Sequence, residues 1–481
     1  MGRLSKLRPE PVSLPAYRRA DLPRFPGWKL MLGPGLVWAA LAQGTGELIF
    51  WPAFTAKYGE WFLWLIVPAS LMQFGASVEI GRYTIITGET IFTGFTRLRP
   101  ALAALLWAGM FAATAWFGAF ASAGGTALGT LTAFPPHWGE RARTLFWADA
   151  TVVVFFLVLV GSRYVYGVIE RFMMVIAAVS LLGVLVAVMH PRVLAQAGPY
   201  AGALVTPHLG FPPGWDPDDL ENLLTSLVYV GMGGFYSFMY AYWLREKGAG
   251  MAGRMGRLAG LRGEAERIEP AGFVFDDRPE NRESYRAWTR YLKVDNGMGL
   301  AINLVTVLAM CWLSLALLRP EGLVPKDWEL AVAQSRFFEV SWGPVGRMLF
   351  LFVASAFLAD TWLGVTDGFA HMHADWCCAN FAWAGRQGLR RVYLGWVVLI
   401  AAGSLVTIPL AAPGPLIAIG GTINFLSMAV YIPILVALNH GVLARRLPGW
   451  TRPSAAWFVY LAGTWLFYMG VSLWYLKTRL T

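Results

Sequence analysis

The chain has 481 residues, of which 57% are hydrophobic and only 14% are charged. Soluble domains contain roughly 45–50% apolar and about 25% charged residues, so this composition excludes a soluble enzyme of several domains. The net charge of +10 would suit nucleic-acid binding in a soluble protein, but cytoplasmic loops of membrane proteins are also rich in Lys and Arg. The composition predicts an all-α protein that crosses a membrane several times.

Eleven apolar stretches are long enough to cross roughly 30 Å of hydrocarbon as helices. They follow an N-terminal tail of residues 1–30 and occupy residues 31–57, 60–82, 100–123, 146–162, 168–190, 222–244, 294–318, 346–370, 391–411, 414–440 and 455–477.

The distribution of basic residues predicts the orientation of these spans. With the N-terminus in the cytoplasm, 29 of the 39 Lys and Arg residues fall in the tail and the cytoplasmic loops. This bias follows the positive-inside rule, so we expect a multi-pass protein of a cell inner membrane and no nucleic-acid partner. The longest loop, 245–293, contains the stretch RMGRLAGLRGEAERIEP. The loop is either a solvated connector, or part of this stretch lies as an amphipathic helix on the membrane surface.

Two spans contain glycines where a membrane helix should be continuous. The first span has Gly44, Thr45, Gly46 and Glu47 at its middle, and the sixth has Gly231, Met232, Gly233 and Gly234. Each glycine costs about 1 kcal/mol in a helix interior relative to alanine. Close helix packing is one explanation, but unwound segments between two half-helices fit the Gly-x-Gly spacing better.

The two interrupted spans are five spans apart. An odd number of spans per repeat inverts the second repeat relative to the first across the membrane. We expect the first repeat over residues 31–190 and the second over residues 222–440, which include loop 245–293. An eleventh span at 455–477 follows the second repeat. Matching interrupted helices in two halves are a sequence sign of a transporter's binding site.

Three segments of the chain have a distinctive sequence: GPGLVWAALAQGTGELIFWPAFTAKYGEWFLW, EIGRYTIITGET and, in the tenth span, INFLSMAVYIPILVALNH. In these segments the sequence resembles the Nramp family of divalent-metal transporters. The resemblance implies the LeuT-type fold, in which two inverted five-helix repeats hold the substrate at the breaks of spans 1 and 6.

The functional motifs depart from the family pattern. Nramp metal carriers have Asp-Pro-Gly-Asn at the first break, where Gly44 and Glu47 take the places of the metal-binding Asp and Asn. In the sixth span the family has Met-Pro-His, and Gly234, Phe235 and Tyr236 stand there. The thioether that favours soft transition metals is then absent, unless Met232 takes its place. Loss of this ligand and the gain of glycine at former side-chain positions predict a wider site.

Carboxylates within spans are costly and are therefore candidates for function. Glu47 could ligate a hard cation, pair with an organic ammonium, carry a coupled proton or cap the second half-helix. Glu79 could relay protons or pair with Arg82, and Asp360 could take part in transport or be a buried hydrogen-bonded acid. The run HMHADWCC (371–378) contains metal-ligand residue types, but its i,i+4 pairs lie on different helix faces and do not converge on one ion.

These observations predict a secondary transporter, not an enzyme, that moves a cation by alternating access with proton coupling and needs no cofactor. The substrate would be a hard divalent ion such as magnesium or another divalent metal. The alternatives are a small organic cation or amino-acid-like solute, or a transporter-like sensor without flux. The expected site comprises both sets of break residues with Tyr236, Ser237 and Asn424. Glu47 is the candidate metal ligand, and Glu47, Glu79 and Asp360 are the candidate proton carriers. The remaining partners are protons and the lipid bilayer.

Overall fold

The computed structural model describes residues 14–31, 33–42, 44, 46–161, 165–231, 233–256, 271–325, 328 and 331–480. These residues are almost entirely helical. Among them, the one sheet joins two short parallel strands, β1 (Arg18–Arg19) and β2 (Phe273–Val274), which tie the N-terminal tail to the segment before the seventh span.

The first repeat begins with the short helix α1 (Trp28–Met31) and a broken helix. The broken helix consists of α2 (Pro34–Ala42), the π-helical turn η2 (Gly46–Phe50) and α3 (Trp51–Tyr58). The helices that follow are α4 (Ile66–Thr87), α5 (Ile91–Leu98), α6 (Pro100–Thr114), α7 (Gly118–Thr132), α8 (Glu140–Gly161), α9 (Val165–Val188), α10 (Pro191–Leu194) and α11 (Ala197–Val205).

The second repeat also begins with a broken helix. Its parts are α12 (Leu220–Tyr229), the 3₁₀ turn η5 (Gly234–Phe238) and α13 (Met239–Glu246). Then come α14 (Pro279–Leu313), which continues through η7 (Ser314–Leu318), α15 (Arg336–Asn380), α16 (Ala382–Gln387), α17 (Leu389–Thr407) and α18 (Pro413–Val436), which continues through η11 (Ala437–Val442). The last helix is α19 (Ala455–Leu480).

Nine helical segments of the described chain are long and apolar enough to cross a membrane. The broken helix α2–α3 and helix α9 occupy the other two of the eleven predicted positions. Two helices are much longer than predicted. α14 begins at Pro279, 15 residues before the predicted start, because Trp288 and Tyr291 bury this extension against Phe25. α15 runs to Asn380 with nearly every residue of its last three turns buried.

The rest of the 245–293 segment contains two short elements among its described residues. Residues 250–254 form a 3₁₀ turn and residues 273–274 form β2. Most of the stretch for which a surface helix was considered, residues 257–270, lies outside the described residues.

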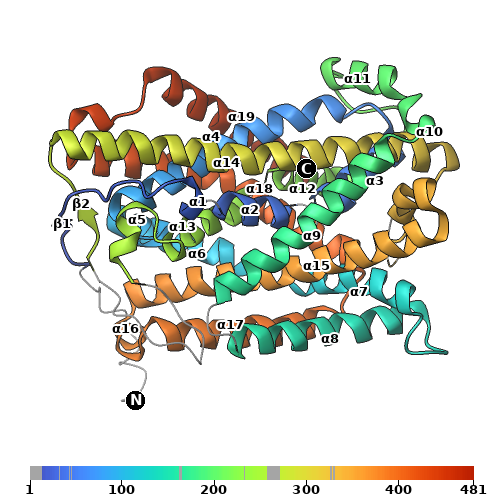
Figure 1. Cartoon of the computed structure of the whole chain (residues 1–481), viewed down its shortest axis with the longest axis horizontal. Helices are drawn as coiled ribbons and strands as arrows, with labels where there is room; N and C mark the ends of the chain where they lie inside the picture. The colour runs from blue at the N-terminus through green and yellow to red at the C-terminus, as the bar shows by residue number, and fades with distance from the viewer. Residues whose placement is uncertain are drawn as a thin grey trace.

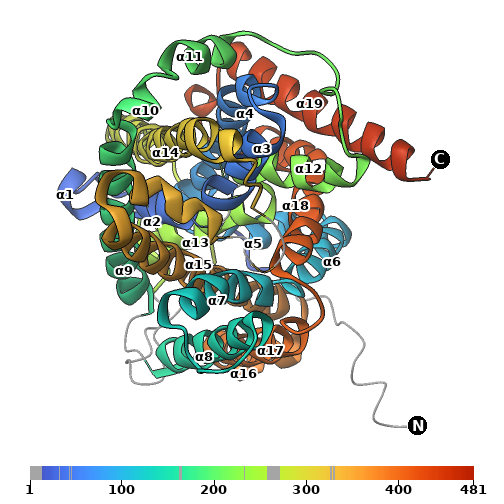
Figure 2. The ribbon, with the colours of Figure 1, turned by 90° about the vertical axis from the view of Figure 1, so that its right-hand side faces the viewer.

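The broken helices lie at the centre of the bundle. α7 contacts α8 and α15, and α15 contacts α17, so these helices form one side of the molecule (Figures 1 and 2). α4 and α14 lie on the other side, with α19 at its edge against α18 and α4. Nearly all described residues of the broken helix α12–α13 are buried, whereas most residues of α19 are not.

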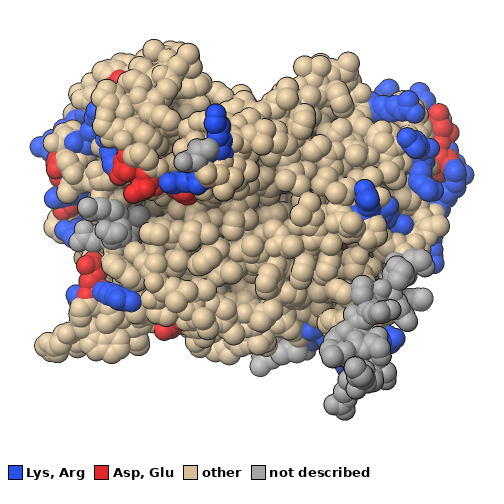
Figure 3. All heavy atoms as spheres, turned by 180° about the vertical axis from the view of Figure 1, so that it is seen from behind, with Lys and Arg blue, Asp and Glu red and all other residues tan. Residues whose placement is uncertain are grey.

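The outer surface has the form expected of a membrane protein. A broad band without charged side chains separates the Lys, Arg, Asp and Glu residues that gather at the two ends (Figure 3). Large apolar side chains such as Leu157 of α8, Leu399 of α17 and Leu466 of α19 are more than half exposed, as expected of helix faces that lipid tails cover.

Candidate functional site

The first break separates α2 from η2. The backbone N–H of Gly44 donates only a 3.3 Å bond to the carbonyl oxygen of Leu41, so the helical hydrogen-bond ladder of α2 ends there. A Cβ atom at Gly44 would overlap the Thr361 hydroxyl of α15. Gly44 therefore permits a close approach between the break and α15. Thr45 and Gln43 lie outside the described residues.

The second break separates α12 from η5. The N–H of Gly233 donates to the carbonyl oxygen of Val228 at 2.7 Å, which closes the last turn of α12. Gly234 has φ +70°, a left-handed conformation that favours glycine, and a Cβ there would lie 2.6 Å from the backbone oxygen of Asn424. A larger residue at position 234 would thus strain its backbone and strike that of α18. Met232 is outside the described part of the chain.

The two breaks touch each other. A Cβ atom at Gly46 would lie 2.7 Å from the Cβ of Tyr229 and 2.9 Å from the Tyr229 backbone oxygen. The first turn after the first break is therefore in contact with the last turn before the second. The structure brings the two glycine segments, 187 residues apart in sequence from Gly44 to Gly231, to one place at the centre of the bundle.

The glycines do not widen this site, contrary to the sequence-based prediction. Neighbouring side chains occupy the space that side chains at the breaks would fill. Thr361 lies against Gly44, and the Gln73 amide lies against both Gly231 and Gly233. The breaks are closely packed because α4 and α15 supply side chains where these glycines have none.

Asn424 and Ser237 are used in structural hydrogen bonds. The Oδ1 of Asn424 accepts a 2.9 Å bond from the N–H of Phe235, and its Nδ2 donates to the carbonyl oxygen of Gly420 at 2.8 Å. Asn424 thereby satisfies an N–H at the start of the second half-helix, a group that has no partner within its own helix. The Ser237 hydroxyl donates to the Gly234 carbonyl oxygen at 2.6 Å and lies 3.0 Å from the Tyr431 hydroxyl.

A small void lies beside the breaks. Its volume is about 10 Å³, roughly the room that one water molecule needs. Its lining is mostly aromatic and aliphatic and consists of Leu41, Ala42, Phe120, Tyr229, Tyr236, Thr361 and Val365. Tyr236 lines this void, and its ring lies 5.4 Å from that of Tyr229 and 5.2 Å from that of Phe369. None of the described residues that line the void carries a carboxylate.

Glu47 and Asp360 are buried acids without hydrogen-bond partners in the described structure. Glu47 lies in the first turn of η2 and is 0% exposed, and Asp360 lies on α15 and is 1% exposed. None of their four carboxyl oxygens has a hydrogen-bond partner among the described residues. An isolated carboxylate anion in an apolar interior is very costly, so a proton or another cation must accompany each group.

Glu79, by contrast, is fully paired. It lies on α4 and makes a 3.3 Å ion pair with Arg82, and it accepts hydrogen bonds from Asn439 Nδ2 and Trp457 Nε1, both at 2.7 Å. His440 Nε2 is 3.4 Å away. The partners come from η11 and α19, so this cluster joins α4 to the tenth and eleventh spans. The geometry favours the structural ion pair over the proton relay for Glu79.

The run 371–378 does not assemble a metal site. Its residues point to separate neighbours: His373 Nε2 lies 3.0 Å from the Thr114 hydroxyl, and the ring of His371 stacks on Tyr393 at 4.3 Å. Within the described ranges, no three His, Cys, Asp or Glu residues are grouped so that they could hold a metal ion. Glu47 therefore belongs to no such group among the described residues.

Two acids close the end of the bundle predicted to face the cytoplasm. Asp295 of α14 accepts a 2.8 Å bond from the Gly35 N–H at the start of α2 and a 2.9 Å bond from the Tyr240 hydroxyl of α13. Asp295 lies within α14 and caps the N-terminus of α2. Asp375 of α15 accepts from the Thr90 hydroxyl and, at 3.1 Å, from the Tyr242 hydroxyl. The inner halves of both broken helices are thus fixed to α14 and α15.

The opposite end of the bundle is open. A vestibule of about 640 Å³ lies between α3, the start of α12 and the start of α18. At its rim, Lys57 Nζ lies 3.2 Å from Asp216 and 2.6 Å from Asp219. The N–H of Asp218 and the Lys57 ammonium hold the pKa of the Asp216 carboxyl below its usual value. No described residue lines both the vestibule and the central void.

Sequence reasoning missed several residues of this site. Phe120, Thr361 and Val365 line the void from α7 and α15, and Gln73 fills the second break from α4. Gln73 could have been found, because an amide in a membrane span is unusual, and it donates to the Leu227 carbonyl oxygen at 2.8 Å. Phe120 and Val365 carry no signal that distinguishes them from other apolar residues in spans.

The fold is similar to that of several solved transporters. A mutant of the Eremococcus coleocola manganese transporter superposes with a TM-score of 0.64 at 15% identity, over 97% of this chain and 90% of the other. Mhp1, a nucleobase-cation-symport-1 family transporter in a closed conformation with bromovinylhydantoin bound, gives a TM-score of 0.53 at 14% identity, over 97% and 96%. MhsT in complex with L-phenylalanine gives 0.52 at 13% identity, over 95% and 98%.

No protein-family model matches the sequence, and no curated protein matches it by sequence. The structural similarities, all below 25% identity, establish the fold alone. The chain has the LeuT-type fold, with two inverted five-helix repeats and an additional C-terminal helix.

Proposed function

We propose that the chain is a secondary transporter that moves a small organic cation between its two broken helices. The observation that carries this proposal is the lining of the central void. Three aromatic rings, those of Phe120, Tyr229 and Tyr236, line the void, and no carboxylate is among its described lining residues. Aromatic faces attract organic cations through their quadrupole, with about 0.5–2 kcal/mol for each favourable contact.

The coupling ion in this proposal is the proton. Glu47 and Asp360 are buried and make no hydrogen bond to any other described residue, so each can gain or lose a proton without breaking a protein contact. Glu47 follows the first break directly and would sense the arrival of a cation there. Glu79 is left out of the coupling mechanism because its ion pair and hydrogen bonds are already complete.

The arrangement of the two ends supports alternating access. The Asp295 and Asp375 contacts hold the predicted cytoplasmic end closed, while the vestibule opens at the other end. The void is too small for an organic substrate, so loading would require the aromatic side chains or the outer half-helices to move apart. Release would then require the contacts of Asp295 and Asp375 to break.

A divalent metal such as magnesium is the second candidate substrate. The unpartnered Glu47 carboxyl group at the first break favours it, because hard cations prefer oxygen ligands. The remaining ligands would be backbone carbonyl oxygens of the breaks and water. A single carboxylate provides weaker charge compensation for a divalent ion than for a monovalent organic cation.

Binding measurements with matched aromatic variants separate these candidates. Thermal stabilisation of the purified protein is measured with tetramethylammonium, ethanolamine, Mg²⁺ and Mn²⁺, since a bound ligand raises stability by mass action. Phe120→Leu, in the void, should weaken binding of the organic cation about 2- to 30-fold. The control Phe111→Leu, on the neighbouring helix α6 with its side chain 46% exposed, should not. Stabilisation by a metal alone, unaffected by Phe120→Leu, would favour the metal.

A further inference from the structure

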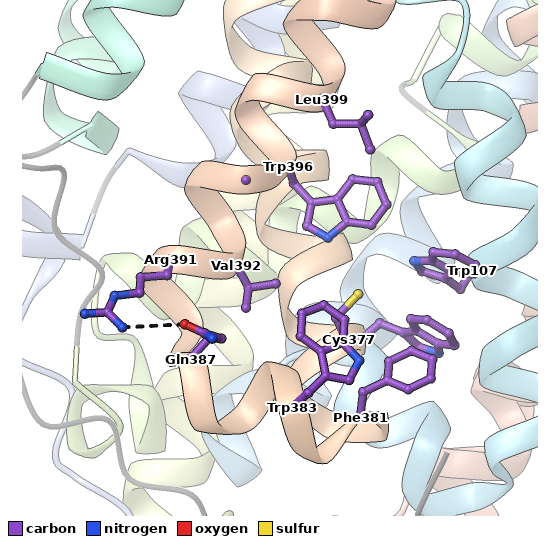
Figure 4. Close-up of a pocket in the computed structure, with 11 residues that line it drawn as sticks. Trp107, Cys377, Phe381, Trp383, Gln387, Arg391, Val392, Trp396 and Leu399 are labelled. Atoms are coloured by element: carbon purple, nitrogen blue, oxygen red, sulfur yellow. Dashed lines mark hydrogen bonds between the residues drawn. The ribbon is translucent and has the colours of Figure 1, made fainter. Parts of the chain in front are cut away.

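Another pocket, separate from the central void and the vestibule, lies where α6, the end of α15, α16 and the start of α17 meet. Its volume is about 600 Å³, within the usual range for ligand sites. The lining is almost entirely apolar and includes four tryptophans: Trp107, Trp376, Trp383 and Trp396. Figure 4 shows the labelled rings of Trp107, Trp383 and Trp396 around one space, with Phe381 beside them and Leu399 at its far end.

The pocket extends from the polar end of the bundle into the uncharged band. Gln387 and Arg391 line it near the start of α17, and Leu399 lines it eight residues further along the same helix. At 1.5 Å per residue, this distance is about 12 Å. Leu399 is 52% exposed and Trp383 is 47% exposed, so the pocket is open to the surroundings of the bundle along this length.

Positive charge gathers at the polar end of this pocket. Arg386, Arg390 and Arg391 lie within six residues of one another, and the described residues that line the pocket include no acid. Arg391 lies 3.5 Å from the Gln387 side-chain oxygen (Figure 4). The first turn of α17 adds the partial positive charge of a helix N-terminus. This is also the end of the bundle where basic loops predict the cytoplasmic face.

We propose that this pocket binds one anionic phospholipid of the cytoplasmic leaflet. The phosphate lies beside Arg391 and Gln387, and one acyl chain runs along Trp396 and Gly395 towards Leu399. Charge and shape both point to this occupant, because the pocket combines a basic rim at headgroup level with an apolar channel at acyl-chain depth. The proposal is independent of the transported substrate.

The test uses the full-length protein in detergent and native mass spectrometry, with phosphatidylglycerol and phosphatidylcholine of identical acyl chains as probes. Phosphatidylglycerol should occupy one tight site that phosphatidylcholine fills much less. Arg391→Gln should weaken this binding about five-fold. Arg286→Gln removes the same charge at an exposed position of α14, at the same predicted cytoplasmic end of the bundle, and should leave the binding unchanged.

A second pair of variants tests the acyl-chain channel. A Cβ at Gly395 meets nothing within 4 Å, so Gly395→Trp can fill the channel without disturbing the backbone, and it should remove the tight site. Gly403→Trp, equally unobstructed on the same helix but outside the pocket, should keep it. Equal binding of both lipids, or binding that survives Gly395→Trp, would overturn the proposal. A dimer abolished by Gly395→Trp would assign the pocket to a second copy of the chain instead.

Discussion

Replacing Gly44 by alanine puts a methyl group between the first break and α15. The new Cβ would overlap the Thr361 hydroxyl and lie 3.3 Å from the Phe357 carbonyl oxygen. The hydroxyl cannot simply rotate away, because it donates a 2.9 Å bond to that same oxygen. Overpacking of this kind costs about 1–3 kcal/mol, which corresponds to an increase of about 5- to 150-fold in the population of conformers where the break and α15 have separated.

Hydrogen exchange of the segment 34–58 measures this opening directly. Gly44→Ala should speed exchange there by the same factor, and adding Thr361→Ala should reverse most of the effect, because it removes the overlapping hydroxyl. Thr366→Ala, at another buried threonine of α15, serves as the control and should give no rescue. If the effects of Gly44→Ala and Thr361→Ala simply add, the close contact does not hold the break closed.

Three further substitutions test other parts of the structure. Glu79→Gln should lower the free energy of unfolding by about 3–5 kcal/mol in a chemical-denaturation assay, because it leaves Arg82 buried without its charge partner. Glu60→Gln, at an exposed position, is the control. Equal stability of the two variants would exclude a structural ion pair. Gly234→Ala should prevent accumulation of folded protein, measured by size-exclusion chromatography, because of the left-handed φ and the Asn424 backbone oxygen. Gly463→Ala, where a Cβ meets nothing within 4 Å, should fold normally, and a well-folded Gly234→Ala variant would refute the packing argument. Asp295→Ala should lower the free energy of opening the predicted cytoplasmic end by about 1.5–3 kcal/mol for each of its two hydrogen bonds. Hydrogen exchange in residues 34–42 should therefore be faster. Unchanged protection there would show that Asp295 does not hold the end closed.

The positions of the two breaks could be predicted because their signal is local. Paired glycines such as Gly44 and Gly46 are unfavourable in a plain membrane helix, and each break does lie where these glycines occur. Most spans could be located for a similar reason, since length and hydropathy alone distinguish them. The extensions of α14 and α15 could not, because polar sequence becomes helical there only through tertiary contacts such as that of Trp288 with Phe25.

The interior of the site could not be predicted, because it depends on residues distant in sequence. Thr361 and Gln73 occupy the space next to the glycines, so a gain of glycine that suggested a wider site accompanies a closely packed one. Glu79 and Glu47 look alike in sequence as carboxylates within apolar spans. Only the structure distinguishes them, since Glu79 receives partners from η11 and α19 and Glu47 receives none from the described residues.

The central claim is coupled transport of an organic cation, and flux into proteoliposomes tests it most directly. Uptake of radiolabelled ethanolamine and Mg²⁺ is measured with and without an imposed pH gradient. We expect uptake of the organic cation that depends on the pH gradient. Glu47→Gln should abolish this uptake, whereas Glu60→Gln, at an exposed site, should preserve it. Uptake of Mg²⁺ alone would contradict the proposed substrate, and uptake unaffected by Glu47→Gln would contradict the proposed coupling. Absence of any flux in a folded protein that still binds the ligand would identify a sensor in place of a transporter.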